Sequence, residues 1–492
     1  MAKFNPKGTS SATKSTETVN AEGGVAYKES AKLEFVSTLL TSFLNDKFYE
    51  SSNETMRRLL TLMTDISDKK FLAKAAIYAR TKFGMRSVTH FTAAELARLV
   101  KGEEWTKKFF CDVVYRPDDM TEIVSYYLKN YKKPLPNSLK KGLGRAFGKF
   151  NSYELAKYRG EGKEVSLVDL VNLIHPKPTE KNGFAIGDLV NKKLKSKDTW
   201  ETELTQAGQK AKTEEEKVQL KSDVWTKLIT EKKIGYFALL RNLRNILEQS
   251  PNIVDQACEM LTDEKLIKNS LVLPFRYHVA YKEIENIGVD GAKKVLRAIN
   301  KAADIALKNV PKFTGKTLIV LDGSGSMDGK PRDIGSLFSA VLLKVNEDAD
   351  FIAFADEAKY FTIDTSDSVI TLADKVAEKS QECGGGTNFH SIFETIKKNY
   401  DRIIILSDMQ GWMTDSTWMH PGAPTKTFAK YKTNYKADPY VYSFNLNDYG
   451  TIMFPEKNVF AIAGWSEKIF DVMKILETDK NALIAEIEKV QL

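Results

Sequence analysis

The spacing of apolar residues changes at about residue 310, and this change separates two kinds of fold. Before it, apolar residues recur every three to four positions, as at Leu33, Val36 and Leu40, which is the spacing of one face of an amphipathic helix. Breaks such as residues 132–138 and 250–252 separate these stretches at intervals of roughly one helical hairpin. The pattern predicts a long helical-repeat array, and the sequence shows no strict period within it.

Short apolar runs after residue 310 are rich in β-branched and aromatic residues, which is typical of buried strands. Segments with helical spacing lie between most of them. This alternation predicts a mostly parallel sheet with helices on both faces, a doubly wound, Rossmann-like domain. The expected fold class is therefore α + α/β. The runs are residues 316–322, 350–354, 402–408, 440–444 and 458–463.

The length and composition are those of a soluble protein with two or more domains. A chain of 492 residues exceeds the usual size of one hydrophobic core. No run approaches the ~18 apolar residues of a membrane span, and residues 1–24 contain no apolar stretch like a secretory signal. We therefore expect a cytoplasmic protein with no membrane contact and a flexible tail over residues 1–24. The three cysteines are far apart, so they predict neither a disulfide framework nor a zinc cluster.

The net charge is distributed unevenly along the chain. The whole sequence carries +8, but residues 311–492 carry a net −6 and the preceding residues a net +14. A basic half joined to an acidic half favours a polyanionic partner for the first half only. The alternative is an even coat of lysine that serves solubility.

Oxygen-bearing side chains follow three of the expected strands. Asp322, Ser324 and Ser326 alternate with glycines directly after the first strand, Thr387 lies in a GlyGlyGlyThrAsn loop, and Asp408 ends a third strand. Glycines let the backbone fold around a cation, and oxygen atoms are the ligands of hard cations. Ligands of open α/β sheets bind beyond the carboxyl ends of the strands. The sequence predicts a metal-ion site at this edge, unless these are only turn-forming residues.

Those five residues resemble the metal-ion-dependent adhesion site of von Willebrand factor A domains, which has Asp-x-Ser-x-Ser, then a Thr, then an Asp. The resemblance implies Mg²⁺, or another divalent cation, with an open position for an acidic side chain of a partner. Metal-assisted hydrolysis would need a general base or a second metal. The nearest candidate base, His390, is more typical of a capping or surface residue at a helix start. We therefore expect no catalysis.

The helical half carries strings that resemble the TROVE module, the helical-repeat ring of the Ro autoantigen family. The order of a TROVE module and then a von Willebrand A domain is that of Ro proteins, and we expect a bacterial or viral member. The implied domains are residues 25–310 for the helical ring and 311–492 for the von Willebrand A domain. The strings are residues 20–27, 155–159, 173–178, 239–244 and 273–277.

Basic residues are concentrated between residues 140 and 177, where Lys and Arg at helical spacing would neutralise phosphates. Phe150, Tyr153 and Tyr158 lie among them and could stack on unpaired bases. The candidates are Lys140, Lys141, Arg145, Lys149, Lys157, Arg159, His175 and Lys177.

The family resemblance assigns two of these residues, Lys157 and His175, to the surface for small noncoding Y RNA. Arg241, Arg244 and Arg276 lie in the other matching strings and are expected to line the ring or its rim. Arg86 and His90 are weaker candidates of the same kind.

The main hypothesis is a monomeric ring that binds RNA without catalysis. The resemblance implies Y-type RNA on the outer basic surface, single-stranded ends of misfolded noncoding RNA in the central hole, and an exoribonuclease tethered through the RNA. An alternative is a metal-dependent protein adaptor built on a peptide-binding solenoid, which would not need so basic a surface. A divalent-metal nuclease is disfavoured because the sequence shows no second acidic cluster.

Overall fold

The computed structural model describes residues 17–19, 25–27, 31–41, 52–160, 162–191, 193–194, 200–409, 425–446, 459–463, 469–478 and 482–492. Within them, a two-stranded sheet and then helices precede residue 310, and a six-stranded sheet with its own helices follows it. No helix in these ranges is long and apolar enough to cross a membrane.

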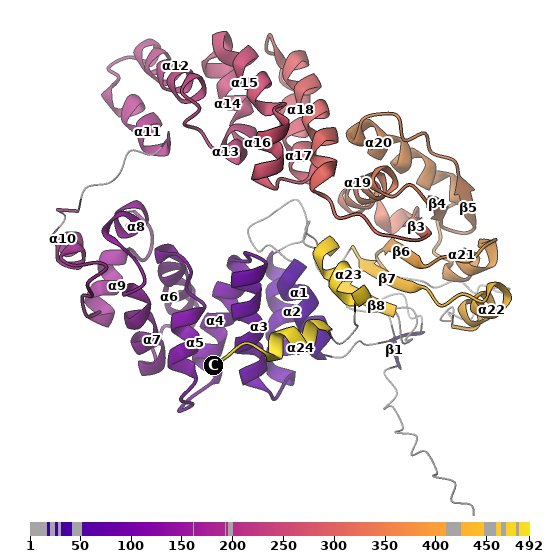
Figure 1. Cartoon of the computed structure of the whole chain (residues 1–492), viewed down its shortest axis with the longest axis horizontal. Helices are drawn as coiled ribbons and strands as arrows, with labels where there is room; N and C mark the ends of the chain where they lie inside the picture. The colour runs from indigo at the N-terminus through magenta and orange to yellow at the C-terminus, as the bar shows by residue number, and fades with distance from the viewer. Residues whose placement is uncertain are drawn as a thin grey trace, which may run out of the picture.

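The helices before residue 310 form two arcs, which Figure 1 shows on opposite sides of a ring. Among the described residues, the first arc ends at Leu194 and the second begins at Trp200. The first arc contains α1 (Ala31–Thr41), α2 (Ser52–Asp65), α3 (Lys69–Lys82), α4 (Ser87–Leu99), α5 (Thr106–Asp112), α6 (Pro117–Tyr131), α7 (Asn137–Phe147), α8 (Ser152–Lys157), α9 (Leu167–Ile174) and α10 (Ala185–Val190). The second contains α11 (Trp200–Lys210), α12 (Glu214–Thr230), α13 (Tyr236–Arg241), α14 (Leu243–Gln249), η1 (Pro251–Ile253), α15 (Val254–Leu261), α16 (Glu264–Ser270), α17 (Pro274–Glu285), α18 (Ala292–Ala306) and η2 (Leu307–Asn309).

Helix α7 shows how the sequence pattern becomes an amphipathic helix. Leu139, Leu143 and Ala146 are buried, whereas Lys141 and Arg145 on the other face are exposed. The next two helices begin with capping boxes, in which an Asn or Ser side chain and an acidic side chain three residues later satisfy each other's backbone amides. These local signals leave Lys141 and Arg145 of α7 exposed to solvent.

The C-terminal sheet has the strand order β5-β4-β3-β6-β7-β8, with β5 antiparallel and the other neighbours parallel. This confirms the predicted mostly parallel sheet; the antiparallel edge strand β5 was not predicted. Its elements are β3 (Thr317–Asp322), η3 (Gly325–Met327), α19 (Lys330–Val345), β4 (Ala349–Phe354), β5 (Ala358–Phe361), α20 (Val369–Ser380), η4 (Gln381–Cys383), α21 (Phe389–Thr395), β6 (Arg402–Ser407), α22 (Thr425–Tyr435), β7 (Tyr440–Asn445), β8 (Val459–Ala463), α23 (Ile469–Thr478) and α24 (Ala482–Glu488).

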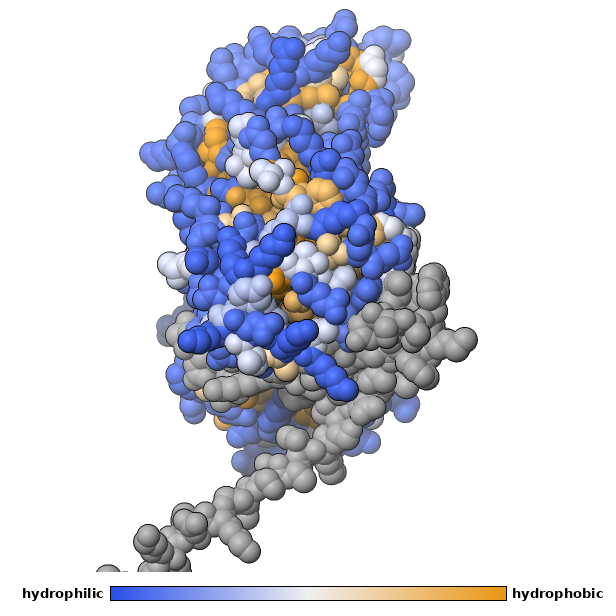
Figure 2. All heavy atoms as spheres, turned by 90° about the vertical axis from the view of Figure 1, so that its right-hand side faces the viewer, coloured by the Kyte–Doolittle hydropathy of each residue, from blue (hydrophilic) through white to orange (hydrophobic). Residues whose placement is uncertain are grey.

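Helices cover both faces of this sheet. Along β3, Ile319 and Leu321 belong to the core that includes α19, α20 and α23, whereas Leu318 and Val320 belong to the core that includes α21 and α22. Every residue of β3 is buried, which is the expected property of a central strand in a doubly wound sheet. Figure 2, which shows the side of the molecule formed largely by this domain, has a mainly hydrophilic surface with small apolar patches.

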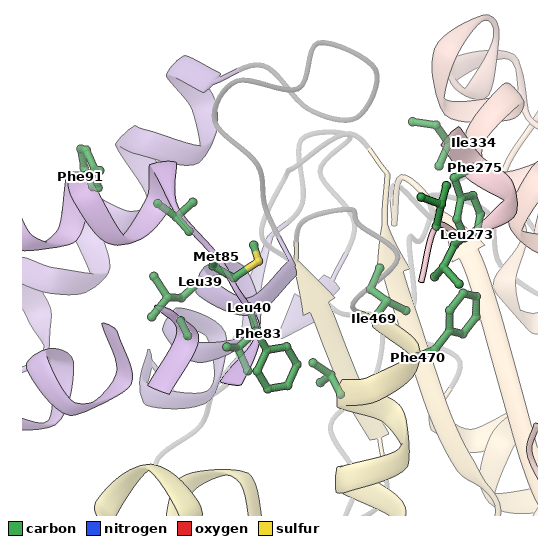
Figure 3. Packing of buried hydrophobic residues seen from close by; sticks show 14 of the residues in the cluster. Leu39, Leu40, Phe83, Met85, Phe91, Leu273, Phe275, Ile334, Ile469 and Phe470 are labelled. Atoms are coloured by element: carbon green, nitrogen blue, oxygen red, sulfur yellow. The ribbon is translucent and has the colours of Figure 1, made fainter. Parts of the chain in front are cut away.

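The last helices connect the sheet domain back to the first arc. Figure 3 shows Ile469 and Phe470 of α23 between the first helices and the α17–α19 region. The ring of Phe470 lies 6.0 Å from that of Phe275 in α17. Helix α24 packs on α3, where Lys74 Nζ lies 3.1 Å from a carboxylate oxygen of Glu488. The sheet domain therefore joins the two ends of the helical array.

One difference from prediction lies at the N-terminus. Residues 17–19 fall in the expected flexible tail, but they form β1 (Glu17–Val19), which pairs antiparallel with β2 (Val25–Tyr27). Backbone pairing between two short β-branched segments accounts for the order. The rest of residues 1–24 lies outside the described residues.

Candidate functional site

A basic surface lies on the first arc, over α7, α8 and the segment after α9. Lys141 and Arg145 are exposed on α7, and His175 and Lys177 are exposed after α9. Among the described residues none of these four forms an ion pair, so the charges of Lys141, Arg145 and Lys177 are not cancelled locally. Lys140 is half-buried on α7, and the exposed ammonium of Lys157 lies 5.5 Å from the ring centroid of Tyr158.

Tertiary contacts hold the segment after α9 against the end of α7. Helix α9 ends at His175, whose φ of 52° turns the chain sharply. The Asn182 side-chain amide donates to the carbonyl of Phe147 at 3.1 Å, and Lys181 donates to the carbonyl of Lys149. Residues 175–182 and α7 therefore form one continuous surface, which we call the α7–α9 basic surface. Lys181 belongs to it and was not among the candidates.

Two of the predicted RNA-binding residues make internal contacts instead of projecting freely. The Lys149 ammonium donates to the carbonyls of Cys111 at 2.9 Å and Val114 at 2.5 Å, near the end of α5. The Arg159 guanidinium donates to the carbonyl of Leu194 at 2.8 Å. Lys149 satisfies carbonyls near the end of α5, and Arg159 satisfies a carbonyl in the segment after α10. The sequence pattern could not distinguish these side chains from exposed charges.

One aromatic candidate and the weaker basic candidates also need correction. Phe150 is 3% exposed and lies in the core, so it cannot stack on a base. Arg86 and His90 surround the buried carboxylate of Asp119, with His90 Nε2 at 2.8 Å. Burial alone would raise the pKa of Asp119, but the hydrogen bond and charge of His90 and the charge of Arg80 hold it well below its ordinary value. This group stabilises the packing of α3, α4 and α6.

The structure brings Arg241, Arg244 and Arg276 together, although they come from separate strings of the sequence. They line a pocket of about 580 Å³ between α13, α14 and α17, together with Phe237. Phe237 is 41% exposed, and the Arg241 guanidinium lies 5.8 Å from the centre of its ring. Phe237 was not a candidate, although its position four residues before Arg241 places the two on one helix face.

The predicted metal-ion residues gather at the carboxyl edge of the sheet. Strands β3 and β6 are parallel neighbours, so Asp322 at the end of β3 and Asp408 after β6 come to the same edge. Asp322 accepts hydrogen bonds from the Ser324 amide at 2.9 Å and from the Ser407 hydroxyl at 2.5 Å. The hydroxyls of Ser324 and Ser326 lie 3.1 Å apart.

The loop that carries Thr387 is fixed beside this edge by its glycines. Asp356 accepts hydrogen bonds from the amides of Gly385 and Gly386 at 3.1 and 2.9 Å. Gly384 has φ of 104°, and a Cβ there would lie 2.1 Å from an Asp356 carboxylate oxygen, so no larger residue fits. The Gly325 amide donates to the Gly385 carbonyl at 3.2 Å. This bond joins the Thr387 loop to the Asp322–Ser326 loop.

The electrostatics of this edge fit a cation. Asp322 and Asp408 are both fully buried, and Thr387 is 2% exposed. Burial and the negative charge of Asp408 raise the pKa of Asp322 to about 7, because two close carboxylates cannot both ionise cheaply in a low dielectric. A divalent cation would relieve this repulsion, and its ligand set of two carboxylates and three hydroxyls suits Mg²⁺ or Ca²⁺.

The acidic residues of this edge would not hold a cation by themselves. Across the described ranges there is no group of three or more His, Cys, Asp or Glu side chains placed to hold a metal ion. Any cation would therefore depend on the hydroxyls. His390, expected at a surface or cap, is 8% exposed and its Nδ1 lies 3.3 Å from the Thr427 hydroxyl.

Comparisons with known proteins agree with this architecture. The protein-family model described as TROVE domain matches residues 27–192 and 190–322. Telomerase protein component 1 of Mus musculus and that of Rattus norvegicus are 22% and 21% identical to this chain over an alignment of length 348, which covers 53% of this chain and 13% of either relative. The crystal structure of Deinococcus radiodurans RO (RSR) protein has the same fold, with a TM-score of 0.63 at 17% identity over 93% of this chain and 99% of that chain. Because the family model covers more than half of its length, the chain belongs to the TROVE domain family.

Proposed function

We propose that this protein is the RNA-binding component of a ribonucleoprotein and that it binds a small structured RNA, of the Y type, on the α7–α9 basic surface. Family membership supports the RNA-binding role in general. The observation that carries the specific proposal is that Lys141, Arg145, His175 and Lys177 share one exposed surface and form no ion pairs within the described part of the chain. Lysine and arginine side chains without an ion-pair partner can bind phosphates, and this binding releases the counterions of the RNA.

The surface is better suited to a structured RNA than to a peptide. Its exposed cations come from a helix and from a rigid segment held by Asn182, so their spacing is fixed before binding. Fixed cations select a phosphate backbone by its shape, with little dependence on base sequence. An acidic peptide would gain less from them, because its charges have no rigid spacing.

We further propose that the carboxyl edge of the sheet holds Mg²⁺ or another divalent cation through Asp322, Ser324, Ser326, Thr387 and Asp408. The fully buried carboxylates and the raised pKa of Asp322 support this assignment. A bound cation would offer an open position to an acidic side chain of a protein partner. This edge lies in a different domain from the α7–α9 basic surface, so the two partners would bind independently (Figure 1).

The finer roles are proposed from the resemblance to Ro proteins. The arcs and the sheet domain form a ring, and we infer that single-stranded ends of misfolded RNA enter its centre. A structured RNA on the outer surface could then tether an exoribonuclease. In this scheme the protein positions RNA and has no catalytic step of its own.

The test is the RNA that copurifies with the full-length protein from its native host. We expect sequencing to find a small structured RNA, and we expect the double variant His175→Gln, Lys177→Gln to retain less than a fifth of it. The control is Lys293→Gln, Arg297→Gln, which removes two exposed cations from α18, at least as much charge as the test variant loses, and should retain the RNA. A wild-type preparation free of RNA, which also fails to bind any structured RNA in a mobility-shift assay, would overturn the proposal.

A further inference from the structure

Arg332, near the start of α19, is a buried charge for which packing alone gives no reason. The residue is 8% exposed, and its Nε atom has no hydrogen-bond partner among the described residues. A buried donor that stays unsatisfied costs free energy, and apolar residues often replace a buried ion pair without loss of stability. The reason for an arginine at this position lies in the contacts of its other two nitrogen atoms.

The guanidinium of Arg332 contacts the Asp322–Ser326 loop. Its Nη2 atom donates to the carbonyls of Gly323 at 3.3 Å and of Ser324 at 3.2 Å. Its Nη1 atom pairs with Asp328, whose side chain is 70% exposed. A guanidinium has only donors, so Arg332 cannot be a metal ligand, and it acts on this loop through the two carbonyls.

The first carbonyl is linked to the orientation of a candidate ligand. The Gly323 carbonyl and the Ser324 amide belong to one rigid peptide plane, in which they point in opposite directions. The Ser324 amide donates to the Asp322 carboxylate at 2.9 Å. Because Arg332 holds one side of this plane, it also holds the amide that fixes Asp322.

The second carbonyl is linked to the loop that carries Thr387. The Ser324 carbonyl shares its peptide plane with the Gly325 amide, which donates to the Gly385 carbonyl at 3.2 Å. One guanidinium therefore fixes two successive peptide planes, and each plane contacts a part of the metal edge on its other side. Without Arg332, both planes would be freer to rotate, and the two loops would lose their mutual placement.

We propose that Arg332 is a positioning residue of the metal edge: its guanidinium holds the peptide groups of Gly323 and Ser324, so that Asp322 and the Thr387 loop keep the arrangement that binds a cation. The inference rests on the proposed metal site and adds a residue outside the set of ligands. A site that is arranged in advance loses less free energy to the ordering of its ligands. The Arg332 side chain therefore raises metal affinity without contacting the metal.

The charge of Arg332 would act in the opposite direction. A positive charge beside the metal edge repels a cation, so removing the charge alone would strengthen metal binding, whereas removing the hydrogen bonds to the loop would weaken it. Arg332→Gln removes both, and Arg332→Lys keeps the charge but replaces the planar fork by a single ammonium. The sign of the change in affinity therefore separates the two roles.

The experiment measures Mg²⁺ affinity by calorimetric titration of the full-length protein after removal of nucleic acid, with the heat of Asp322→Ala subtracted. Changes to residues that orient metal ligands typically lower metal affinity by roughly 10- to 100-fold. We therefore expect Arg332→Gln and Arg332→Lys each to weaken Mg²⁺ binding by about tenfold. Thermal unfolding without Mg²⁺ measures the stability of each variant separately.

Two control variants and a chemical rescue accompany the titration. Asp328→Asn removes the exposed ion pair but leaves the carbonyl contacts, and it should change Mg²⁺ affinity by less than about threefold. Lys330→Gln removes an exposed cation from the start of the same helix and should leave the affinity unchanged. Arg332→Ala vacates the space of the side chain, so added ethylguanidinium should restore part of its Mg²⁺ binding.

Native protein that binds no Mg²⁺ would refute the proposed metal site and this inference together. Native affinity in Arg332→Lys, or stronger binding by Arg332→Gln, would refute the positioning role and leave the metal site standing. A loss of Mg²⁺ affinity that appears only with an equal loss of stability, and that ethylguanidinium does not reverse, would mean that Arg332 serves folding alone. Weaker binding at unchanged stability, with rescue by ethylguanidinium, supports the positioning role.

Discussion

Neutralising Lys141 and Arg145 tests whether the α7–α9 basic surface binds phosphates. Both side chains are exposed, lie one turn apart on α7 and have no ion-pair partner among the described residues, so each is free to contact one phosphate. Each phosphate contact contributes about −0.9 to the slope of the logarithm of the association constant against the logarithm of the salt concentration. At 0.15 M salt, one contact therefore strengthens binding by about fivefold relative to 1 M salt. Lys141→Gln, Arg145→Gln should therefore weaken a structured RNA by about 30-fold.

The assay is a titration of the copurifying RNA at several salt concentrations. We expect the slope of the double variant to be less steep than that of the native protein by about 1.8. The control, Lys293→Gln, Arg297→Gln, removes the same charge at the same helical spacing from α18. The reasoning would be refuted if the two double variants lost affinity equally, or if affinity fell with no change of slope, because either result would mean that total charge or a structural defect is responsible.

Three further predictions concern the framework and the metal edge. Asp119→Asn should destabilise the protein by about 3–5 kcal/mol, because it leaves the buried Arg80 guanidinium without its carboxylate. Asp118→Asn is the milder control in thermal unfolding, because the arginine partners of Asp118, Arg86 and Arg116, are each 36% exposed. Burial lowers the pKa of His278 from 6.5 to about 4, so the unfolded chain binds the proton at a higher pH than the folded chain does. The free energy of unfolding should therefore fall by about 3 kcal/mol between pH 6.5 and 4. His278→Asn should flatten that part of the pH profile of stability, and a variant profile identical to the native one would contradict this prediction. In thermal unfolding, Mg²⁺ at a hundred times its Kd should stabilise the native protein by about 2.7 kcal/mol and should not stabilise Asp322→Ala. The affinity of Asp322→Ala for structured RNA should stay within twofold of the native affinity.

Much of the architecture was predictable because its signals are local. The alternation between buried and exposed faces in α7 follows from the spacing of Leu139 and Leu143 around Lys141, and the buried strands follow from short β-branched runs such as residues 402–408. The Asp322–Ser326 loop could be predicted because parallel neighbouring strands bring their carboxyl ends to one edge. The antiparallel strand β5 was missed, since residues 358–361 carry no distinct alternation and are ordered by pairing with β4.

Packing between distant segments determines which basic residues face solvent and which lie beside each other. Lys141 and Lys149 are eight positions apart and look alike in the sequence, but one is exposed and the other satisfies carbonyls near the end of α5. Arg241 and Arg276 share a pocket only because α13 and α14 pack beside α17. Periodicity specifies the face of a helix on which a side chain lies, because that depends on neighbours along the chain. The partner of that face depends on packing between segments distant in sequence, which no local pattern encodes.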